Sequence, residues 1–518
     1  MSTSSQNRNS DQPAPRSSRI VSLKQFLDEA VFIGAKDIEV RRCCNRADKC
    51  QAGDVFVPDH NGSGDEADKV EVAIKRGAVA VVTERLLPVT IPQCLVDDTR
   101  TVYAKICHAL AGNPSQRMLT IGVVGSQGKT TTSLFIASLL KRMAGAVAYY
   151  TSLGSSDSTE CDRTATTPPA AAKLARWMER ADRAGAPAAI VELSSPMLHN
   201  QAIAGVEFDL IVVTSMRPGQ FRGSPTTKQI EALVTGCIGQ LKDHGVLIVN
   251  ADDASAASFA ERVDMPTVLY GLDAGHHIRG KRLSRSGGEQ QVLAIAGTTM
   301  MPLTLKMPGD QMARAALAAL AVAWITELPI PQSIGAIEAL QTIPGRMQRI
   351  QQAVDVPLFI DAAQTPDRVA TALHALRLHQ FGPCTVVMDL GNQLEANWRQ
   401  RLGEVLEKNA ARVVLTSSDL SPEATQRLAM DVLGGCQAAG RVQVIPDREA
   451  AIAWAVRNTE TGCVLLSGCG ASLWTNRQGL DTCDEIVAKR VLAQNNEKTA
   501  TNPLCIFPPS SSTEYFPF

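Results

Sequence analysis

A short glycine-containing loop carries the clearest chemistry in the sequence, and it reads Gly125-Ser126-Gln127-Gly128-Lys129-Thr130-Thr131. Phosphate groups need several converging backbone N–H donors, a positive side chain and, when Mg²⁺ accompanies them, a hydroxyl ligand. The two glycines let the backbone come close, Lys129 would neutralise β- and γ-phosphate charge, and Thr130 would hold the metal. We therefore predict that this loop binds ATP with Mg²⁺.

The neighbouring elements decide how the loop is interpreted, because a glycine turn can also be purely structural. The longer phosphate-loop pattern would place another glycine at position 123, where this chain has valine, so the match is to the shorter G-x-x-G-K-T-T form. A buried-strand pattern over 119–124 precedes the loop, and an apolar helical pattern over 131–143 follows it. This order of strand, loop and helix favours phosphate binding over a structural turn.

Length and composition describe the rest of the chain in outline. A chain of 518 residues, 45% hydrophobic and 20% charged, exceeds what one core usually supports, so we expect three domains. A net charge of -1 provides no basic field for nucleic acid or anionic lipid, and no run of about 18 apolar residues could span a membrane. Residues 1–18 lack a secretory-signal pattern. We expect a cytoplasmic monomer that acts on small molecules, without a nucleic-acid or membrane partner.

The thirteen cysteines are scattered, with no C-x-x-C and no metal-ligand spacing with histidine. This pattern favours reduced thiols over a disulfide framework. Cys469, between two glycines, is interpreted as a buried structural thiol.

Three stretches of the sequence have different patterns, and each predicts a domain. Residues 20–114 mix short strands, at 54–57 and 78–82, with a helix, and predict a small α/β domain. Residues 115–342 contain the loop and further buried strands, which predict a central P-loop domain with a parallel sheet. Residues 343–494 repeat the alternation of strand and helix and predict a Rossmann-like, doubly wound domain. Residues 1–19 and 495–518 are expected to be a disordered lead and tail.

The strands expected in the two larger sheets are short apolar runs separated by helical patterns. Their predicted ranges are 119–124, 188–192, 209–214 and 245–250 in the central sheet, and 358–361, 385–389, 412–416 and 463–467 in the C-terminal sheet.

Further motifs occur in a fixed order around the loop. They are Cys44-Asn45-Arg46, the stretch 52–57, Thr166-Thr167-Pro168, Glu192-Leu193-Ser194-Ser195, the stretch 249–253, Pro344-Gly345-Arg346 and the stretch 361–367. With these motifs the chain, from about residue 20 to residue 490, resembles the Mur ligases, most closely the UDP-N-acetylmuramyl-tripeptide synthetases. That resemblance implies an ATP-dependent reaction in peptidoglycan precursor synthesis, in which a UDP-N-acetylmuramyl peptide carboxylate is phosphorylated and an amino acid amine attacks the acyl phosphate.

The resemblance also implies roles for individual residues. Glu192 would hold a second magnesium ion, and Arg346 and Asp361 would approach ATP from the C-terminal side. The residues implied to contact the UDP-muramyl peptide are Asn45, Arg46, Thr166, Thr167 and Ser194. Other interpretations stay open: Glu192 as a solvated carboxylate at a strand end, residues 166–168 as a turn before a helix, and Arg346 as part of a hinge.

The sequence departs from the family pattern at several chemical positions. The family's Asn-x-x-Asp-His stretch is Ser215 to Gln220 here, and its carboxylated lysine falls on Ala232, one helical turn after Lys228. The other departures replace expected polar or charged residues: Pro196 and Gln364 for histidines, Met312 and Ala315 for adenine-contacting asparagines, 419–422 for the arginine-bearing Asp-Asn-Pro-Arg, and 468–472 for Gly-Lys-Gly-His-Glu. These changes leave diaminopimelate specificity unsupported.

Two functions follow from these observations. The first is an ATP-dependent amide ligase of the Mur type, supported by the loop, by Glu192 and by the length of the resemblance. The second is a catalytically impaired relative that binds nucleotide or a UDP-sugar peptide as a binding or regulatory module, supported by the lost polar positions. A P-loop kinase or motor ATPase would share only the loop.

Overall fold

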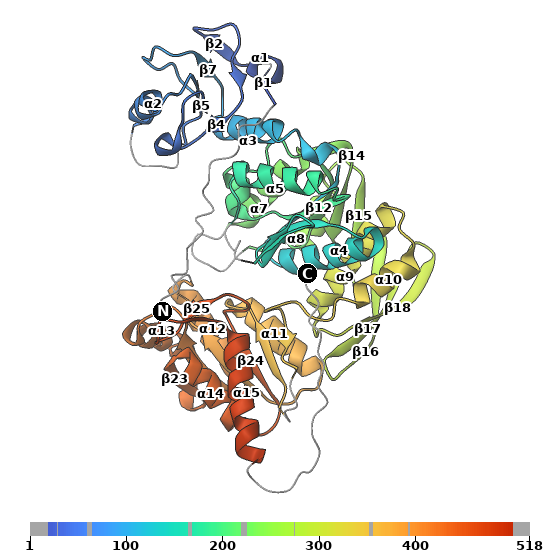
Figure 1. Ribbon diagram of the computed structural model, residues 1–518. Helices are drawn as coiled ribbons and strands as arrows, with labels where there is room; N and C mark the ends of the chain where they lie inside the picture. The colour runs from blue at the N-terminus through green and yellow to red at the C-terminus, as the bar shows by residue number, and fades with distance from the viewer. Residues whose placement is uncertain are drawn as a thin grey trace.

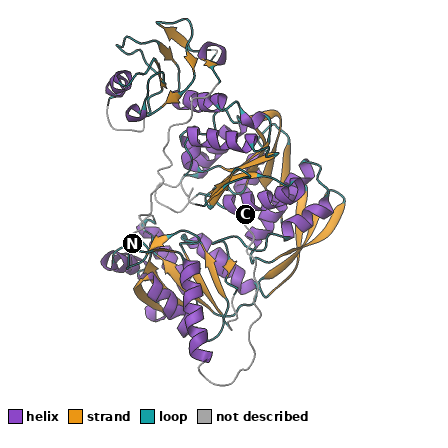
Figure 2. Ribbon diagram, in the orientation of Figure 1, coloured by secondary structure: helices purple, strands orange, loops and turns teal. Residues whose placement is uncertain are grey.

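The computed structural model describes residues 19–27, 29–59, 65–163, 168–218, 225–273, 275–351, 356–391 and 394–500. Three sheets, each with its own helices, follow one another along the chain and form three bodies (Figure 1). The α/β class predicted from the sequence is confirmed, because each of the three bodies contains both helices and strands (Figure 2). The predicted contacts Thr166 and Thr167 lie outside the described residues.

The N-terminal body is built on a five-stranded sheet of order β2-β7-β6-β5-β4. Its strands are β2 (Val31–Ile33), β7 (Gln93–Leu95), β6 (Ala80–Thr83), β5 (Val55–Phe56) and β4 (Cys43–Cys44), and β1 (Val21–Ser22) pairs with β3 (Glu39–Val40) beside it. Its helices are α1 (Leu23–Phe26), α2 (Glu66–Lys75) and α3 (Thr99–Leu110), with short 3₁₀ turns at Ala47–Lys49 and Pro114–Gln116. Helix α3 packs on α5 (Ala171–Arg183) of the central body, which joins the two bodies.

The central body contains an eleven-stranded sheet of order β11-β10-β9-β12-β8-β13-β14-β15-β16-β17-β18. The parallel part comprises β9 (Ala148–Thr151), β12 (Ala188–Glu192), β8 (Leu119–Val124), β13 (Phe208–Val213), β14 (Leu241–Asn250), β15 (Thr267–Gly271) and β16 (Ile278–Ser286). Both edges are antiparallel, through β10 (Gly154–Ser156) and β11 (Cys161–Asp162) at one end and β17 (Glu289–Ala296) and β18 (Thr299–Leu305) at the other. The parallel sheet predicted from the sequence is confirmed, and the antiparallel strands at its two edges are additions that the sequence analysis did not predict.

Helices cover both faces of this central sheet. On one face lie α4 (Lys129–Ala144), α9 (Asp310–Ile325) and α10 (Ile330–Glu338), which share a core with the inward residues of the sheet. On the other lie α5 (Ala171–Arg183), α6 (Ser195–His199), α7 (Thr227–Ile238) and α8 (Ala254–Ala260). Because both faces are covered, β8, β12, β13 and the end of β14 are largely continuous apolar runs, which is why the sequence predicted them. The parallel strands β9, β15 and β16 were not predicted.

The C-terminal body contains a six-stranded sheet of order β19-β20-β24-β21-β22-β23. Its strands are β19 (Gln348–Arg349), β20 (Leu358–Asp361), β24 (Cys463–Ser467), β21 (Cys384–Asp389), β22 (Arg412–Ser417) and β23 (Val442–Asp447). Helices α11 (Pro366–Leu378), α12 (Ala396–Asn409) and α13 (Pro422–Leu433) pack on one face, and α14 (Arg448–Asn458) and α15 (Asp484–Ala500) on the other. A small pair, β25 (Trp474–Thr475) and β26 (Asp481–Thr482), follows β24, and a 3₁₀ turn at Ala439–Arg441 precedes β23.

The C-terminal helix extends further than the sequence predicted. Helix α15 continues to Ala500, beyond residue 495, where the disordered tail was expected to begin. Residues 1–18 and 501–518 lie outside the described part of the chain. None of the described helices is both long and apolar enough to cross a membrane.

Candidate active site

The glycine loop lies at the carboxyl edge of the central sheet, between β8 and α4. Gly125 has a φ of +141°, and a Cβ there would meet the Thr214 hydroxyl at 2.4 Å, so only glycine fits. Gly128, with a φ of +82°, precedes the first turn of α4, which begins at Lys129. The first N–H groups of this sixteen-residue helix therefore face the loop, which is the arrangement that binds anions.

Strands on either side of β8 bring further polar groups to the same edge. The Thr214 hydroxyl, after β13, donates to the carbonyl of Gln127 at 2.6 Å and so restrains the loop. The Ser126 N–H donates to the carbonyl of Ser215 at 2.9 Å. Ser215 in turn donates from its hydroxyl to Asp253 at 2.8 Å. The loop is thus held in shape by its neighbours before any ligand binds.

Glu192 ends β12 and is buried, with a side chain that contacts the loop helix. Its Oε1 accepts from the Thr130 hydroxyl at 3.0 Å, and its Oε2 accepts from the Ser152 N–H at 2.8 Å. Thr130 and Ser152 also share a hydrogen bond between their hydroxyls at 2.9 Å. Glu192 is only 8% exposed, which argues against the interpretation of it as a solvated carboxylate.

This group of oxygens fits Mg²⁺. The ion prefers one or two protein oxygens and leaves its other positions to water and substrate phosphates. Thr130 and Glu192 supply a hydroxyl and a carboxylate at the start of the loop helix, beside Lys129. Within the described residues no group of three or more His, Cys, Asp or Glu side chains could hold a metal alone. The site therefore suits an ion that arrives with phosphates.

Lys129 is half-buried beside the loop, and its Nζ donates to the carbonyl of Gly125 at 2.8 Å. Burial lowers the pKa of its ammonium group, Glu192 opposes that shift, and Arg368 and Arg346 add to it. Two arginines of the C-terminal body therefore lie near the lysine. Such a concentration of positive charge is typical of a site for a polyanion.

The C-terminal residues of the predicted site lie around the end of β20. Asp361 ends that strand and accepts from the Met347 N–H at 2.8 Å, which ties it to the segment containing Arg346. Burial raises the pKa of Asp361, against the effect of Arg346. The structure thus brings Arg346 and Asp361 together with Lys129.

The predicted substrate contacts are distributed more widely. Ser194 precedes α6, and its buried hydroxyl has no hydrogen-bond partner among the described residues. Asn45 and Arg46 follow β4 in the N-terminal body, apart from the loop (Figure 1). Arg46 there forms an exposed ion pair with Asp48 at 2.7 Å. These residues would have to contact a long substrate that extends from one body to the next.

The positions that depart from the family pattern also have defined places. Met312 and Ala315 are buried in α9 and belong to the central core. Lys228 and Ala232 are exposed on α7. Sequence reasoning missed three residues at the loop, Ser152, Thr214 and Arg368. Ser152 and Thr214 each follow a strand next to β12 or β8, so the rule that ligands bind at carboxyl strand ends could have found them.

Apart from the loop site, a cavity of about 400 Å³ opens at the carboxyl edge of the C-terminal sheet. Asp389, Ser418 and Cys469 line it at the ends of β21, β22 and β24. Cys469 is buried, and burial raises the pKa of its thiol, as expected for an inert structural cysteine. The cavity lies where the sequence departs most from the family pattern.

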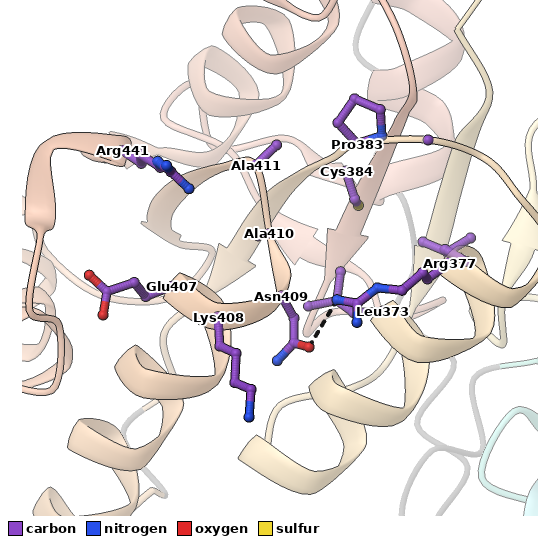
Figure 3. Close-up of a pocket in the computed structure, with 12 residues that line it drawn as sticks. Leu373, Arg377, Pro383, Cys384, Glu407, Lys408, Asn409, Ala410, Ala411 and Arg441 are labelled. Atoms are coloured by element: carbon purple, nitrogen blue, oxygen red, sulfur yellow. Dashed lines mark hydrogen bonds between the residues drawn. The ribbon is translucent and has the colours of Figure 1, made fainter.

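A smaller cavity, of about 220 Å³, lies at the opposite edge of that sheet, where β21 begins (Figure 3). Arg377 donates to the Asn409 side chain there at 3.1 Å, as the dashed line shows (Figure 3). Open α/β sheets bind ligands at the carboxyl ends of their strands. This cavity is therefore not assigned to the site.

Comparison with known proteins identifies two family matches along the chain. Residues 123–323 match the Mur ligase middle domain, and residues 345–470 match the Mur ligase, glutamate ligase domain. A UDP-N-acetylmuramoyl-L-alanyl-D-glutamate--2,6-diaminopimelate ligase of Halalkalibacterium halodurans is 26% identical over 442 residues, covering 83% of this chain and 90% of that protein. The enzyme of the same name from Synechococcus elongatus is 27% identical over 453 residues, covering 84% and 90%.

Solved structures show the same architecture. The structure of a UDP-N-acetylmuramoyl-L-alanyl-D-glutamate--2,6-diaminopimelate ligase has a TM-score of 0.68 at 21% identity, covering 92% of this chain and 100% of that one. The MurF ligase from Thermotoga maritima in complex with ADP has a TM-score of 0.60 at 18% identity, covering 89% and 99%. Since these identities are low, the structural matches establish the fold.

Proposed function

The chain belongs to the Mur ligase family of ATP-dependent amide-bond ligases, and we propose that it joins an amino acid to a UDP-N-acetylmuramyl peptide in peptidoglycan precursor synthesis. A carboxylate oxygen of the peptide attacks the γ-phosphorus of ATP, and the bond to the β-phosphate oxygen breaks to release ADP. The amine nitrogen of the amino acid then attacks the acyl phosphate, loses a proton and displaces inorganic phosphate. The observation that carries this proposal is the cluster of the half-buried Lys129 with the buried Thr130 and Glu192 at the loop.

The loop residues have separate roles in this reaction. Backbone N–H groups of Gly125 to Thr131 hold the phosphates, and Lys129 neutralises charge on the β- and γ-phosphates. Thr130 and Glu192 would hold Mg²⁺, which would supply charge neutralisation on the transferring phosphoryl group. Arg346 and Asp361 reach the nucleotide from the C-terminal body.

The peptide substrate extends across the N-terminal and central bodies. We assign Asn45 and Arg46 to the uridine end and Ser194, with Thr166 and Thr167, to the peptide end near the carboxylate. The unpartnered hydroxyl of Ser194 supports this assignment, because a buried polar group without a partner is costly unless a ligand satisfies it.

The wider setting is also part of the proposal. Residues 20–114, 115–342 and 343–494 would be the three domains, and their separate sheets support these boundaries. We propose that the protein acts as a monomer in the cytoplasm, where ATP and UDP-linked precursors are found, without a nucleic-acid or membrane partner.

The decisive experiment measures phosphate release from ATP and Mg²⁺ with a panel of UDP-muramyl peptides and amino acids. Ligase activity predicts release that requires both the peptide and one amino acid. Binding of ATP and peptide without release under any combination would instead favour the binding module, an alternative that the family matches do not favour.

A further inference from the structure

One arginine of the C-terminal body contacts the glycine loop directly. Arg368 lies in the first turn of α11, and its Nη2 donates to the carbonyl of Ser126 at 3.2 Å. The two residues are 242 positions apart in the sequence. The contact therefore depends on the way the C-terminal body lies against the central one.

Arg368 and Lys129 both contact the loop and lie close enough for Arg368 to lower the pKa of the lysine. The lysine donates to the carbonyl of Gly125, and the arginine donates to the carbonyl of the next residue. Both cations thus contact loop carbonyls, which are weak neutral acceptors compared with phosphate oxygens. A ligand with negatively charged oxygens would offer both a stronger partner.

Positive charges outnumber negative charges around Lys129 and Arg368. Lys129, Arg346 and Arg368 provide three cations, whereas the acids that act on them are Glu192 and Asp361. Burial lowers the pKa of the Arg368 guanidinium, and Arg346 lowers it further. Among the described residues Arg368 forms no ion pair. Its hydrogen bond goes to the neutral carbonyl of Ser126. A half-buried arginine beside other cations is less favourable without an anion than with one.

We propose that Arg368 is an additional phosphate-binding residue, which moves from the Ser126 carbonyl to the γ-phosphate of ATP when the nucleotide binds. The inference rests on the proposed function, because it requires ATP phosphates in the loop. The planar guanidinium can donate two hydrogen bonds to one phosphate and keeps its charge. It supplies positive charge at the oxygens of the transferring group, as arginines do in other phosphoryl-transfer sites.

If Arg368 had a purely structural role, it would only hold the C-terminal body against the central one. Another arginine that contacts both bodies provides a matched control for that role. Arg349 also reaches from the C-terminal body to the central one, where its Nη1 donates to the carbonyl of Gly287 at 2.9 Å. Its guanidinium lies over Phe381, 5.8 Å from the ring centroid. Gly287 lies in the turn between β16 and β17, on a different part of the sheet from the loop.

The test compares binding of ADP and of β,γ-methylene-ATP, both with Mg²⁺, to the full-length protein by calorimetry. Arg368→Gln is expected to weaken the ATP analogue about 10- to 100-fold, the effect of losing charge-assisted hydrogen bonds, and to change ADP binding by less than about threefold. Arg368→Lys should recover at least part of the lost affinity. Arg349→Gln should leave the ratio of the two affinities unchanged.

The outcomes separate this inference from the proposed function. If the wild-type protein does not bind the analogue, the proposed function fails. If it binds, and Arg368→Gln weakens both nucleotides equally or behaves like Arg349→Gln, only the role of Arg368 is overturned. An Arg368→Lys variant no better than Arg368→Gln would also overturn it.

Discussion

Replacing Lys129 by methionine should affect thermal stability differently in the free protein and in the protein bound to ATP and Mg²⁺. In the nucleotide-free protein a half-buried lysine with a lowered pKa is less favourable in its charged form than it is after unfolding. This penalty is fully present at pH 7, below the ordinary pKa of lysine, and methionine removes it while keeping a similar length. The lost hydrogen bond to Gly125 offsets about 1 kcal/mol of the gain. We expect the free variant to be at least as stable as the wild type, within a few degrees.

With nucleotide the expected change has the opposite sign. ATP and Mg²⁺ at about 100 times the dissociation constant stabilise the wild type by about 2.7 kcal/mol. For a body of this size that corresponds to a rise in melting temperature of about 5–11 °C. Loss of the lysine contacts should raise the dissociation constant about 10- to 100-fold. At the same nucleotide concentration the stabilisation then falls to about 0.4–1.4 kcal/mol.

Thermal unfolding with and without ATP and Mg²⁺ measures both effects. Lys141→Met is the matched control, since this exposed lysine lies in the last turn of the same helix. The control should keep the full shift. A Lys129→Met variant with an undiminished shift would place the nucleotide elsewhere, and a free variant that melts more than about 5 °C below the wild type would refute the electrostatic argument.

Four further predictions follow. Glu192→Gln should weaken Mg²⁺ binding to the nucleotide-bound protein at least about 10-fold, measured by titrating Mg²⁺, and an unchanged titration would remove Glu192 from the metal site. Burial lowers the pKa of His108 to about 4, so stability should fall by up to about 3 kcal/mol between pH 6.5 and pH 4, because the unfolded chain binds the proton first. Urea unfolding should show a flatter pH dependence for His108→Leu, and an equal slope would contradict this. Limited proteolysis should cut near residues 341–344 or in the terminal segments, and a single resistant unit over 119–490 would contradict the domain boundaries. Phosphate release with diaminopimelate should not exceed release with lysine, alanine or no amino acid.

The parts of the site that sequence analysis found are those that lie close together in the chain. The loop from Gly125 to Thr131 was predicted because phosphate binding needs consecutive N–H groups, a lysine and a hydroxyl within a few residues. Residues 188–192 and 358–361 were predicted as strands because buried parallel strands are uninterrupted apolar runs. Glu192 and Asp361 end those strands, so their places at the carboxyl edges followed.

What was missed depends on contacts between distant segments or on weaker patterns. The contact between Arg368 and Ser126 links two sheets, and no local spacing encodes it. Strands β16 to β18 were not predicted. Side-chain burial alternates along β17 and β18, and β16 is mostly polar and exposed. These strands therefore lack the fully buried pattern of β8 and β12, so the antiparallel edge of the central sheet was not anticipated.

We propose that the amino acid binds in the C-terminal cavity of about 400 Å³, and the charges there are the reason that a diaminopimelate substrate is not expected. Asp389 accepts from the Ser418 N–H at 2.7 Å and lies 3.6 Å from the buried Arg448, so its charge is already compensated. Arg399 is engaged by Asp431 at 2.9 Å. Asp419 is exposed and accepts a hydrogen bond from Ser417, which leaves it able to receive an ammonium group. A distal ammonium and carboxylate would both need partners, because an unpaired buried charge is strongly unfavourable. Among the described residues lining the cavity, the carboxylate partner is lacking, so an amine without a distal carboxylate fits best.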